Sequence, residues 1–349
     1  MATKRSFQPM RRLTTWQLRQ LALLGLLLAG CSRAQPKTAD SEYIAPAREP
    51  AKAAEPARHT QVELPVPQQF HGIRTRDGAA LSADELLAEL SHADAICVGE
   101  EHDNPRHHWA QYRILSELIE RRQMGGRKLG LGLEMVSRKA QPALNRWSRG
   151  ESKAPQTLAE LKWNETWGYD FGNYAPLWRL ARRYRVELVG LNLEPALSKH
   201  LARAGMKGLT AEQRAELPQA MSFRDRDHRR YFNAAMAHHP PPKSSHDHSY
   251  QVQVAWDETM ADTASRWLGK LQPASQLLIL AGLAHCRESA IPSRLERRAA
   301  QVKVASVRPW VEGAQPPLAE LLEEGSFDYV LVMSAETAPT RRRRRIPPP

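Results

Sequence analysis

The chain has 349 residues, of which 25% are charged, and its formal net charge is +12. Five of the positive charges lie in residues 1–30 and five in Arg341–Arg345, so the rest of the chain carries only +2. A body this close to neutral lacks the concentrated basic surface of a nucleic-acid-binding protein, and we expect no nucleic acid among its partners.

Residues 1–30 have the pattern of a lipoprotein signal peptide. Basic side chains precede an apolar run, Leu21–Leu28, which is too short to cross the roughly 30 Å hydrocarbon core of a membrane. Small residues stand directly before Cys31, as in a lipobox, so we expect cleavage before Cys31 and attachment of lipid to its thiol. An ordinary signal peptide with an incidental cysteine is the alternative. Ser32, where an aspartate would favour inner-membrane retention, indicates the periplasmic face of the outer membrane in the cell envelope.

The remaining sequence divides by composition into three parts. Residues 31–67 are rich in Ala, Pro, Glu and Lys and lack apolar periodicity, which indicates a flexible spacer behind the lipidated cysteine. Residues 68–335 are long enough to form one domain with a sizeable core. Residues 336–349 contain the arginine run and are expected to form a disordered basic tail, which is either solvated or in contact with phosphates of lipid or polysaccharide.

Short apolar runs alternate with helical patterns through residues 68–335. Helices are expected from Pro105 to about Met124, near 139–147, from Pro195 onward and near 289–298, and the pattern over 212–271 is only helical. The alternation predicts an α/β fold with a mostly parallel β-sheet covered by helices, and with an inserted helical lobe. The expected strands are 95–98, 129–135, 186–192, 276–281, 302–307 and 329–333.

Two of the expected strands end in the same way, with a glycine, two residues and a histidine. The motifs are Gly99-Glu-Glu-His102 and Gly282-Leu-Ala-His285. Because the carboxyl ends of parallel strands meet at one edge of a sheet, where ligands collect, the two imidazoles are expected in one pocket. Glu134 and Asn192 end two further strands and could add a carboxylate and an amide. The alternative is that each histidine merely caps a local hydrogen bond.

These motifs resemble a known family. Val98-Gly-Glu-Glu-His-Asp-Asn-Pro-Arg-His-His108 is similar to the signature of the ChaN-like lipoproteins, which are haem-binding members of the Tiki/TraB/erythromycin-esterase superfamily. The resemblance covers roughly residues 70 to 335. It continues through Leu133-Glu-Met135, Trp167-Gly-Tyr-Asp170, Leu191-Asn-Leu193, Trp256-Asp-Glu-Thr-Met-Ala261, Ala281-Gly-Leu-Ala-His285 and Ile291-Pro-Ser-Arg-Leu295.

The superfamily resemblance implies a polar centre of the kind found in hydrolases, some of which depend on a divalent metal. The residues that match are Glu100, His102, Glu134 and His285, with Arg287 as a possible anion partner. The family resemblance instead implies a protein that binds haem in a homodimer, with a tyrosinate on the iron and basic side chains of the partner subunit on the propionates. Haem uptake or storage, in contact with a haem receptor system, is the function that follows.

No motif identifies the haem tyrosine, so candidates come from the residues alone. Tyr174 lies in an aromatic stretch with three tryptophans in residues 163–178, although a buried core cluster explains this stretch equally well. Tyr231 follows Arg229 and Arg230, which we expect to lower the pKa of its phenol and so to favour tyrosinate. A histidine-rich loop begins at His238 and His239 and could bind metal or haem, with a solvated polar loop as the alternative. We favour Tyr231 over Tyr174.

Three further pairs of residues have simpler explanations. Asp257 and Glu258 could point into the site, but a helix surface is the usual place for such acids. Of His107 and His108, at most one can share a helix face with His102. Cys97 and Cys286 could form a disulfide, but two small buried thiols are the interpretation that we favour.

Two hypotheses therefore remain. The first is a membrane-anchored haem-binding lipoprotein. The second is a hydrolase in which His102 or His285 acts as general base, with or without a divalent metal.

Overall fold

The computed structural model describes residues 69–123, 127–237, 246–269 and 275–335. The expected signal peptide, spacer and basic tail lie outside these residues, as do His238 and His239. None of the helices within the described residues has the length and apolar character that crossing a membrane requires.

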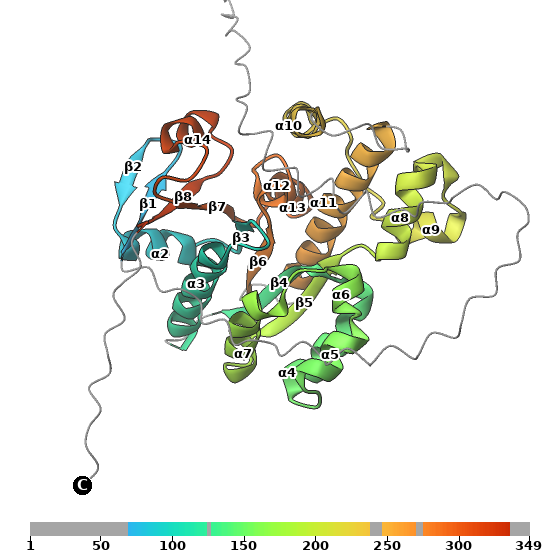
Figure 1. The fold of residues 1–349 in the computed structure, drawn as a ribbon, viewed down its shortest axis with the longest axis horizontal. Helices are drawn as coiled ribbons and strands as arrows, with labels where there is room; N and C mark the ends of the chain where they lie inside the picture. The colour runs from blue at the N-terminus through green and yellow to red at the C-terminus, as the bar shows by residue number, and fades with distance from the viewer. Residues whose placement is uncertain (1–68, 124–126, 238–245, 270–274, 336–349) are drawn as a thin grey trace, which may run out of the picture.

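The described residues form one eight-stranded sheet with the order β2-β1-β8-β7-β3-β6-β4-β5 (Figure 1). The strands β3 to β8 all run parallel to one another, whereas β1 is antiparallel to both β2 and β8. The strands are β1 (Phe70–Arg74), β2 (Ala79–Leu81), β3 (Ala95–Glu100), β4 (Lys128–Ser137), β5 (Glu187–Asn192), β6 (Ser275–Gly282), β7 (Val304–Val311) and β8 (Tyr329–Met333).

Helices cover both faces of this sheet, because its central strands are apolar on both sides. Ile96 of β3 belongs to a core with α2, α3, α4 and α7, whereas its neighbour Ala95 belongs to a second core with α11 and α13. The helices are α2 (Ala83–Ser91), α3 (Pro105–Gln123), α4 (Gln141–Arg149), α5 (Ala154–Glu160), α6 (Trp163–Thr166), α7 (Ala175–Arg183), α8 (Pro195–Ala204), α9 (Ala211–Ala215), α10 (Arg226–Met236), α11 (His246–Gly269), α12 (Leu283–Cys286), α13 (Ile291–Arg298) and α14 (Leu318–Glu324), with 3-10 turns η1 (Arg138–Ala140), η2 (Phe171–Asn173) and η3 (Met206–Gly208).

The predicted α/β architecture is confirmed, with its mostly parallel sheet and its helical insertion before β6. The first half of α11 packs with α8 through the cluster around Leu201 and Val252, and its second half packs on the sheet through Met260 and Ala264. The strands β1 and β2 were not predicted, because they are short and only partly buried and so have no continuous apolar run.

Cys97 and Cys286 form a disulfide, so the interpretation of two unpaired thiols is wrong. The strands β3 and β6 are parallel neighbours, and α12 begins directly where β6 ends. This short helix packs on β3 and carries Cys286 to within 5.3 Å of Cys97, measured between Cα atoms. The bond therefore ties the segment that contains His285 to the strand that leads to His102.

Candidate functional site

The two glycine–histidine motifs lie side by side. Glu100, the last residue of β3, is paired in register with Gly282, the last residue of β6. The strand β4, which carries Glu134, is the other neighbour of β6. The adjacent strand ends therefore bring together Glu100, His102, Glu134 and His285, the four residues that the sequence nominated. All four side chains are buried.

His102 is held by one carboxylate. Its Nδ1 lies 2.9 Å from Oε1 of Glu100. The same oxygen accepts a hydrogen bond of 2.6 Å from the hydroxyl of Tyr174, and Gln111 donates to Oε2 at 2.8 Å. Burial acts to raise the pKa of Glu100, but the imidazoles of His108 and His102 and the phenolic donor outweigh it and lower this pKa to about 2. Glu100 is therefore an ionised carboxylate throughout the neutral range.

His285 is held between two carboxylates. Its Nδ1 lies 2.6 Å from Oδ1 of Asp257, and its Nε2 lies 3.2 Å from Oε1 of Glu134. Burial acts to lower the pKa of His285, but these two charges outweigh it and raise the pKa to about 10. The same attraction lowers the pKa of Glu134 and of Asp257 against the effect of their own burial. At neutral pH His285 is thus an imidazolium.

The site has two halves, one around His102 and one around His285, and Glu134 lies between them. Its Oε2 accepts a hydrogen bond of 2.6 Å from the backbone N–H of Gly282, and its charge contributes to a raised pKa of His102. The absence of a side chain at Gly282 allows His102 to approach the end of β6 closely, because a Cβ atom at this position would lie 3.0 Å from Cε1 of His102. Asn192 does not join the contacts described for this centre; its Oδ1 accepts from the N–H of Leu193.

Asp257 and Glu258 are completely buried, so their assignment to a helix surface is wrong. Oδ2 of Asp257 lies 2.8 Å from Nε2 of His228, whose Nδ1 lies 3.1 Å from the hydroxyl of Tyr250. Glu258 is enclosed by arginines of α13, among them Arg297. Sequence reasoning missed His228 and Tyr250, because α10 and the start of α11 carry no motif that links them to the strand ends.

His107 and His108 are both buried and have separate partners. Nε2 of His108 lies 3.0 Å from the carbonyl oxygen of His102, so it supports the loop that holds that residue. Nδ1 of His107 accepts a hydrogen bond of 2.9 Å from the N–H of Glu101. Burial, together with the charge of Arg308, lowers the pKa of His107 to about 4, which agrees with a neutral acceptor.

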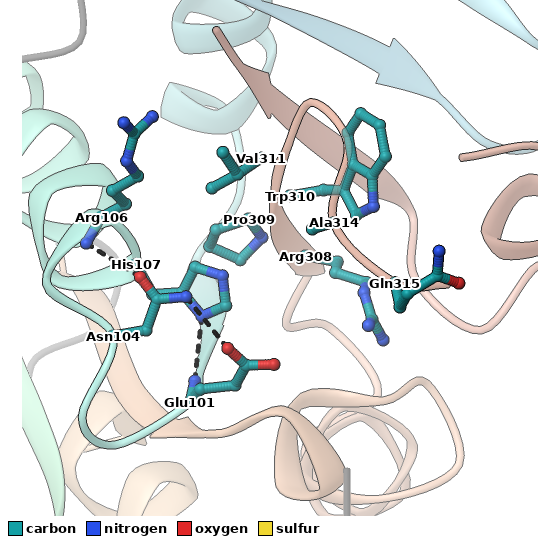
Figure 2. Close-up of a pocket in the computed structure, with 10 residues that line it drawn as sticks. All are labelled: Glu101, Asn104, Arg106, His107, Arg308, Pro309, Trp310, Val311, Ala314 and Gln315. Atoms are coloured by element: carbon teal, nitrogen blue, oxygen red, sulfur yellow. Dashed lines mark hydrogen bonds between the residues drawn. The ribbon is translucent and has the colours of Figure 1, made fainter. Parts of the chain in front are cut away.

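A small cavity opens beside His107, between the start of α3 and the end of β7 (Figure 2). Its volume is about 240 Å³, which is below the roughly 300–1,000 Å³ of pockets that enclose small-molecule ligands. Arg308 and Trp310 of β7 face Glu101 and His107 across it in Figure 2. Burial lowers the pKa of Arg308 to about 10. The cavity adjoins the candidate site but is smaller than a porphyrin would need.

The aromatic stretch is mainly part of the core, and one end of it touches the site. Trp163, Tyr174 and Trp178 are buried in the core that α7 shares with the sheet. The rings of Trp167 and Tyr169 lie 4.6 and 4.8 Å from the ring of His102, measured between centroids. Burial and the charge of Glu100 raise the pKa of Tyr174 well above 10.

The two arginines that precede Tyr231 in sequence are not the ones that contact its side chain. Arg229 pairs with Asp247 and lies over the ring of Tyr250, and Arg230 pairs with Asp227. The expectation that these two arginines lower the pKa of Tyr231 is therefore wrong, because successive residues on a helix point in different directions.

Arg287 is the cation that contacts Tyr231, with its guanidinium carbon 3.7 Å from the centre of the phenol ring. Burial raises the pKa of Tyr231, while Arg287 and Arg308 act to lower it. Arg287 also forms an ion pair with Glu324 and donates to Oγ of Ser326.

The described residues do not support a divalent-metal site. No three His, Cys, Asp or Glu side chains among them are arranged so that they could hold a metal ion. The imidazoles and carboxylates of the site are instead paired with one another.

Comparison with known proteins agrees with this fold. A search of curated proteins finds no match. Among solved structures, one that reports cofacial haem binding to ChaN of Campylobacter jejuni has a TM-score of 0.61 at 20% identity, over 76% of this chain and 97% of that one. A protein from Bacillus cereus has a TM-score of 0.42 at 11% identity, over 78% of this chain and 94% of that one. An erythromycin esterase has a TM-score of 0.40 at 12% identity, over 76% and 82% of the two chains.

A family model provides the identification. The model described as haem-binding uptake, Tiki superfamily, ChaN matches residues 86–295, which include both glycine–histidine motifs and every residue of the buried site. Since the match spans more than half of the chain, this protein belongs to the ChaN family of the Tiki superfamily.

Proposed function

We propose that this chain binds haem through Tyr231, on the face formed by α10 and α12. The observation that carries the proposal is the contrast between the two candidate phenols. Tyr174 is fully enclosed, and its hydroxyl is engaged by Glu100 and by Nε1 of Trp167. Tyr231 is only half-buried as a residue, and its ring packs against Ala235 and Ala284.

The residues around Tyr231 fit a haem in two respects. A tyrosinate ligand needs nearby positive charge, because the ordinary pKa of a phenol is about 10, and Arg287 and Arg308 supply that charge here. Ala235 and Ala284 pack against the ring of Tyr231 and so fix the direction in which the phenol points. Haem would supply its iron as the electrophile, and the chain's part is to orient the phenol and to place the charges of Arg287 and Arg308 beside it, where they oppose the rise in pKa that burial causes.

A second copy of the chain is the proposed cover for the haem. The cavity beside Arg308 is too small to enclose a porphyrin, and Tyr231 is half-buried rather than enclosed. Two copies that meet over this face would bury the haem between them. Sedimentation of the chain with and without haem tests this step, and dimers that form only with haem are expected.

A haem titration of the full chain tests the ligand. Wild type should give a saturable Soret band shifted from that of free haem. Tyr231→Phe keeps the ring but removes the oxygen, so it should lose the shifted band while it keeps its melting temperature. Tyr174→Phe is the matched control and should retain haem. If Tyr231→Phe binds like wild type and Tyr174→Phe does not, the ligand assignment is overturned.

Electrostatics does not favour the hydrolase alternative. A general base must accept a proton near neutral pH, whereas His285, with a pKa of about 10, already carries one. His102 also has a raised pKa, and its Nδ1 is engaged by Glu100. The centre is therefore proposed as a scaffold that positions α12, and with it Arg287, beside Tyr231.

We also propose that the domain is anchored in the cell envelope by lipid on Cys31, at the periplasmic face of the outer membrane, where it serves haem uptake or storage. The disulfide between Cys97 and Cys286 supports export, because such bonds persist in oxidising compartments. Fatty-acid labelling of cells tests the anchor. Wild type should acquire the label, and Cys31→Ser should remain an unlabelled precursor; a labelled Ser variant would contradict the proposal.

A further inference from the structure

A second candidate binding site lies far from the histidines, in a groove between α7 and the connection from α4 to α5. In Figure 1 these helices lie at the bottom of the view, whereas α10 and α12 lie near its top. The groove has a volume of about 460 Å³. Its lining consists of one tryptophan, one alanine and four cationic side chains: Trp147, Ala154, Lys153, Arg179, Arg182 and Arg183.

No carboxylate lines this groove. The nearest acids in sequence are used elsewhere, since Glu151 pairs with Arg149 and Glu160 with Arg146. Within the part of the chain that the structure describes, no salt bridge involves Lys153, Arg179 or Arg183. Four like charges around one groove repel each other, and a bound anion would relieve that repulsion.

Arg182 is held in place before any ligand arrives. Its guanidinium carbon lies 5.0 Å from the ring centre of Trp147, and its Nη1 donates to the carbonyl oxygen of Ser152 at 3.3 Å. Gly150 ends α4 with φ +80° and permits this close approach, because a Cβ atom there would lie 2.8 Å from Nη2 of Arg182. The loop thus holds one guanidinium in place beside the other cations of the groove, of which Arg183 lies over the ring of Tyr184.

We propose that this groove binds a phosphate group. A guanidinium presents a planar set of donors that matches phosphate oxygens, and stacking on an indole preserves that donor edge. A phosphomonoester carries about −1.5 to −2 charges near neutral pH, which suits four cations better than a singly charged carboxylate does. The phosphate can belong to a soluble phosphate ester or to a lipid headgroup. The proposal does not depend on haem binding.

The experiment compares two double variants of the full chain. Arg179→Gln with Arg183→Gln removes two cations of the groove. Lys199→Gln with Arg203→Gln removes the same charge from the exposed surface of α8 and is the matched control. In calorimetric titrations with inorganic pyrophosphate, the groove variant should bind at least about tenfold more weakly than wild type, because two cations that form charge-assisted hydrogen bonds with phosphate oxygens are lost. The control should bind like wild type, and both should keep the melting temperature.

Vesicles distinguish the two sources of phosphate. Hydrogen exchange of residues 150–183 is followed with vesicles of phosphatidylcholine, with and without phosphatidic acid, whose headgroup is a phosphomonoester. Protection that needs phosphatidic acid and is absent in the groove variant supports a headgroup ligand. Pyrophosphate binding without such protection supports a soluble phosphate ester. If neither probe distinguishes the groove variant from the control, the groove is not a phosphate site and the proposal is overturned.

Discussion

The two glycine–histidine motifs have the same spacing and occupy adjacent strand ends, yet their imidazoles lie in different electrostatic surroundings. His102 is hydrogen-bonded to one carboxylate, Glu100, whose other contacts include a phenol and an amide. His285 lies between two carboxylates, Asp257 and Glu134. The strand and its glycine therefore determine where each histidine is placed. The carboxylates around it, Glu100 of β3, Glu134 of β4 and Asp257 of α11, determine its charge.

The largest expected difference between the two halves is in stability. His285→Ala removes the only imidazole between Asp257 and Glu134 and leaves two buried carboxylates without it, which should lower the free energy of unfolding by about 3–5 kcal/mol. His102→Ala should cost less, about 1–3 kcal/mol, because Glu100 keeps its bonds from Tyr174 and Gln111. Urea unfolding measures both. Equal losses would contradict the assigned difference in charge.

The next effect concerns the disulfide that ties the two halves together. The double substitution Cys97→Ala and Cys286→Ala removes the covalent link between α12 and β3. The unfolded chain is then no longer restricted by a closed loop, so the free energy of unfolding should fall by about 2–4 kcal/mol. Reduction of wild type with dithiothreitol should lower the melting temperature, and the double variant, which cannot be reduced, is the control. A variant as stable as oxidised wild type would show that the bond is not formed in solution.

A change of pH should reveal a smaller difference between His285 and His102 than substitution does, because titration changes the charge of a ring and leaves the ring in place. His285 has its pKa raised from 6.5 to about 10, so its contribution to stability is complete below pH 6.5 and is lost as the pH rises through about 10. The pKa of His102 is also raised. Wild type should lose stability over this alkaline window, His285→Gln should lose much less, and His102→Gln should keep the part of the loss that depends on His285. Melting temperatures in matched buffers measure the slopes; a wild type that gains stability with rising pH would contradict the assignment.

Much of this arrangement could be predicted from the sequence, and the failures have physical causes. Continuous apolar runs that end in glycine mark buried parallel strands, so the positions of Glu134, His102 and His285 followed from local pattern. Asp257 and His228 could not be found in that way, since their partners are distant in sequence and a helical acid is usually exposed. The arginine beside Tyr231 was misassigned for the same reason. The cation that contacts this phenol is Arg287, at the end of α12, which is distant in sequence from Tyr231 in α10.

The smallest expected effect compares the two tyrosines that support the histidine centres. Tyr174 donates at 2.6 Å to Glu100, an ionised carboxylate, whereas the hydroxyl of Tyr250 lies 3.1 Å from Nδ1 of His228. Hydrogen bonds to charged groups contribute about 1.5–3 kcal/mol and other hydrogen bonds about 0.5–1.5 kcal/mol. Tyr174→Phe should therefore lower the free energy of unfolding by about 2 kcal/mol and Tyr250→Phe by about 1 kcal/mol.

Both substitutions keep the aromatic ring, so they report on the hydroxyl alone. Loss of the Tyr174 donor should also raise the pKa of Glu100, because that hydroxyl is one of the groups that lower it against burial. Stability in acid would then begin to fall at a higher pH in Tyr174→Phe than in wild type, while Tyr250→Phe should follow the wild-type acid profile. If the acid profile of Tyr174→Phe also follows that of wild type, Glu100 is held ionised by the imidazoles of His102 and His108 alone, and the phenol serves only to fill the core.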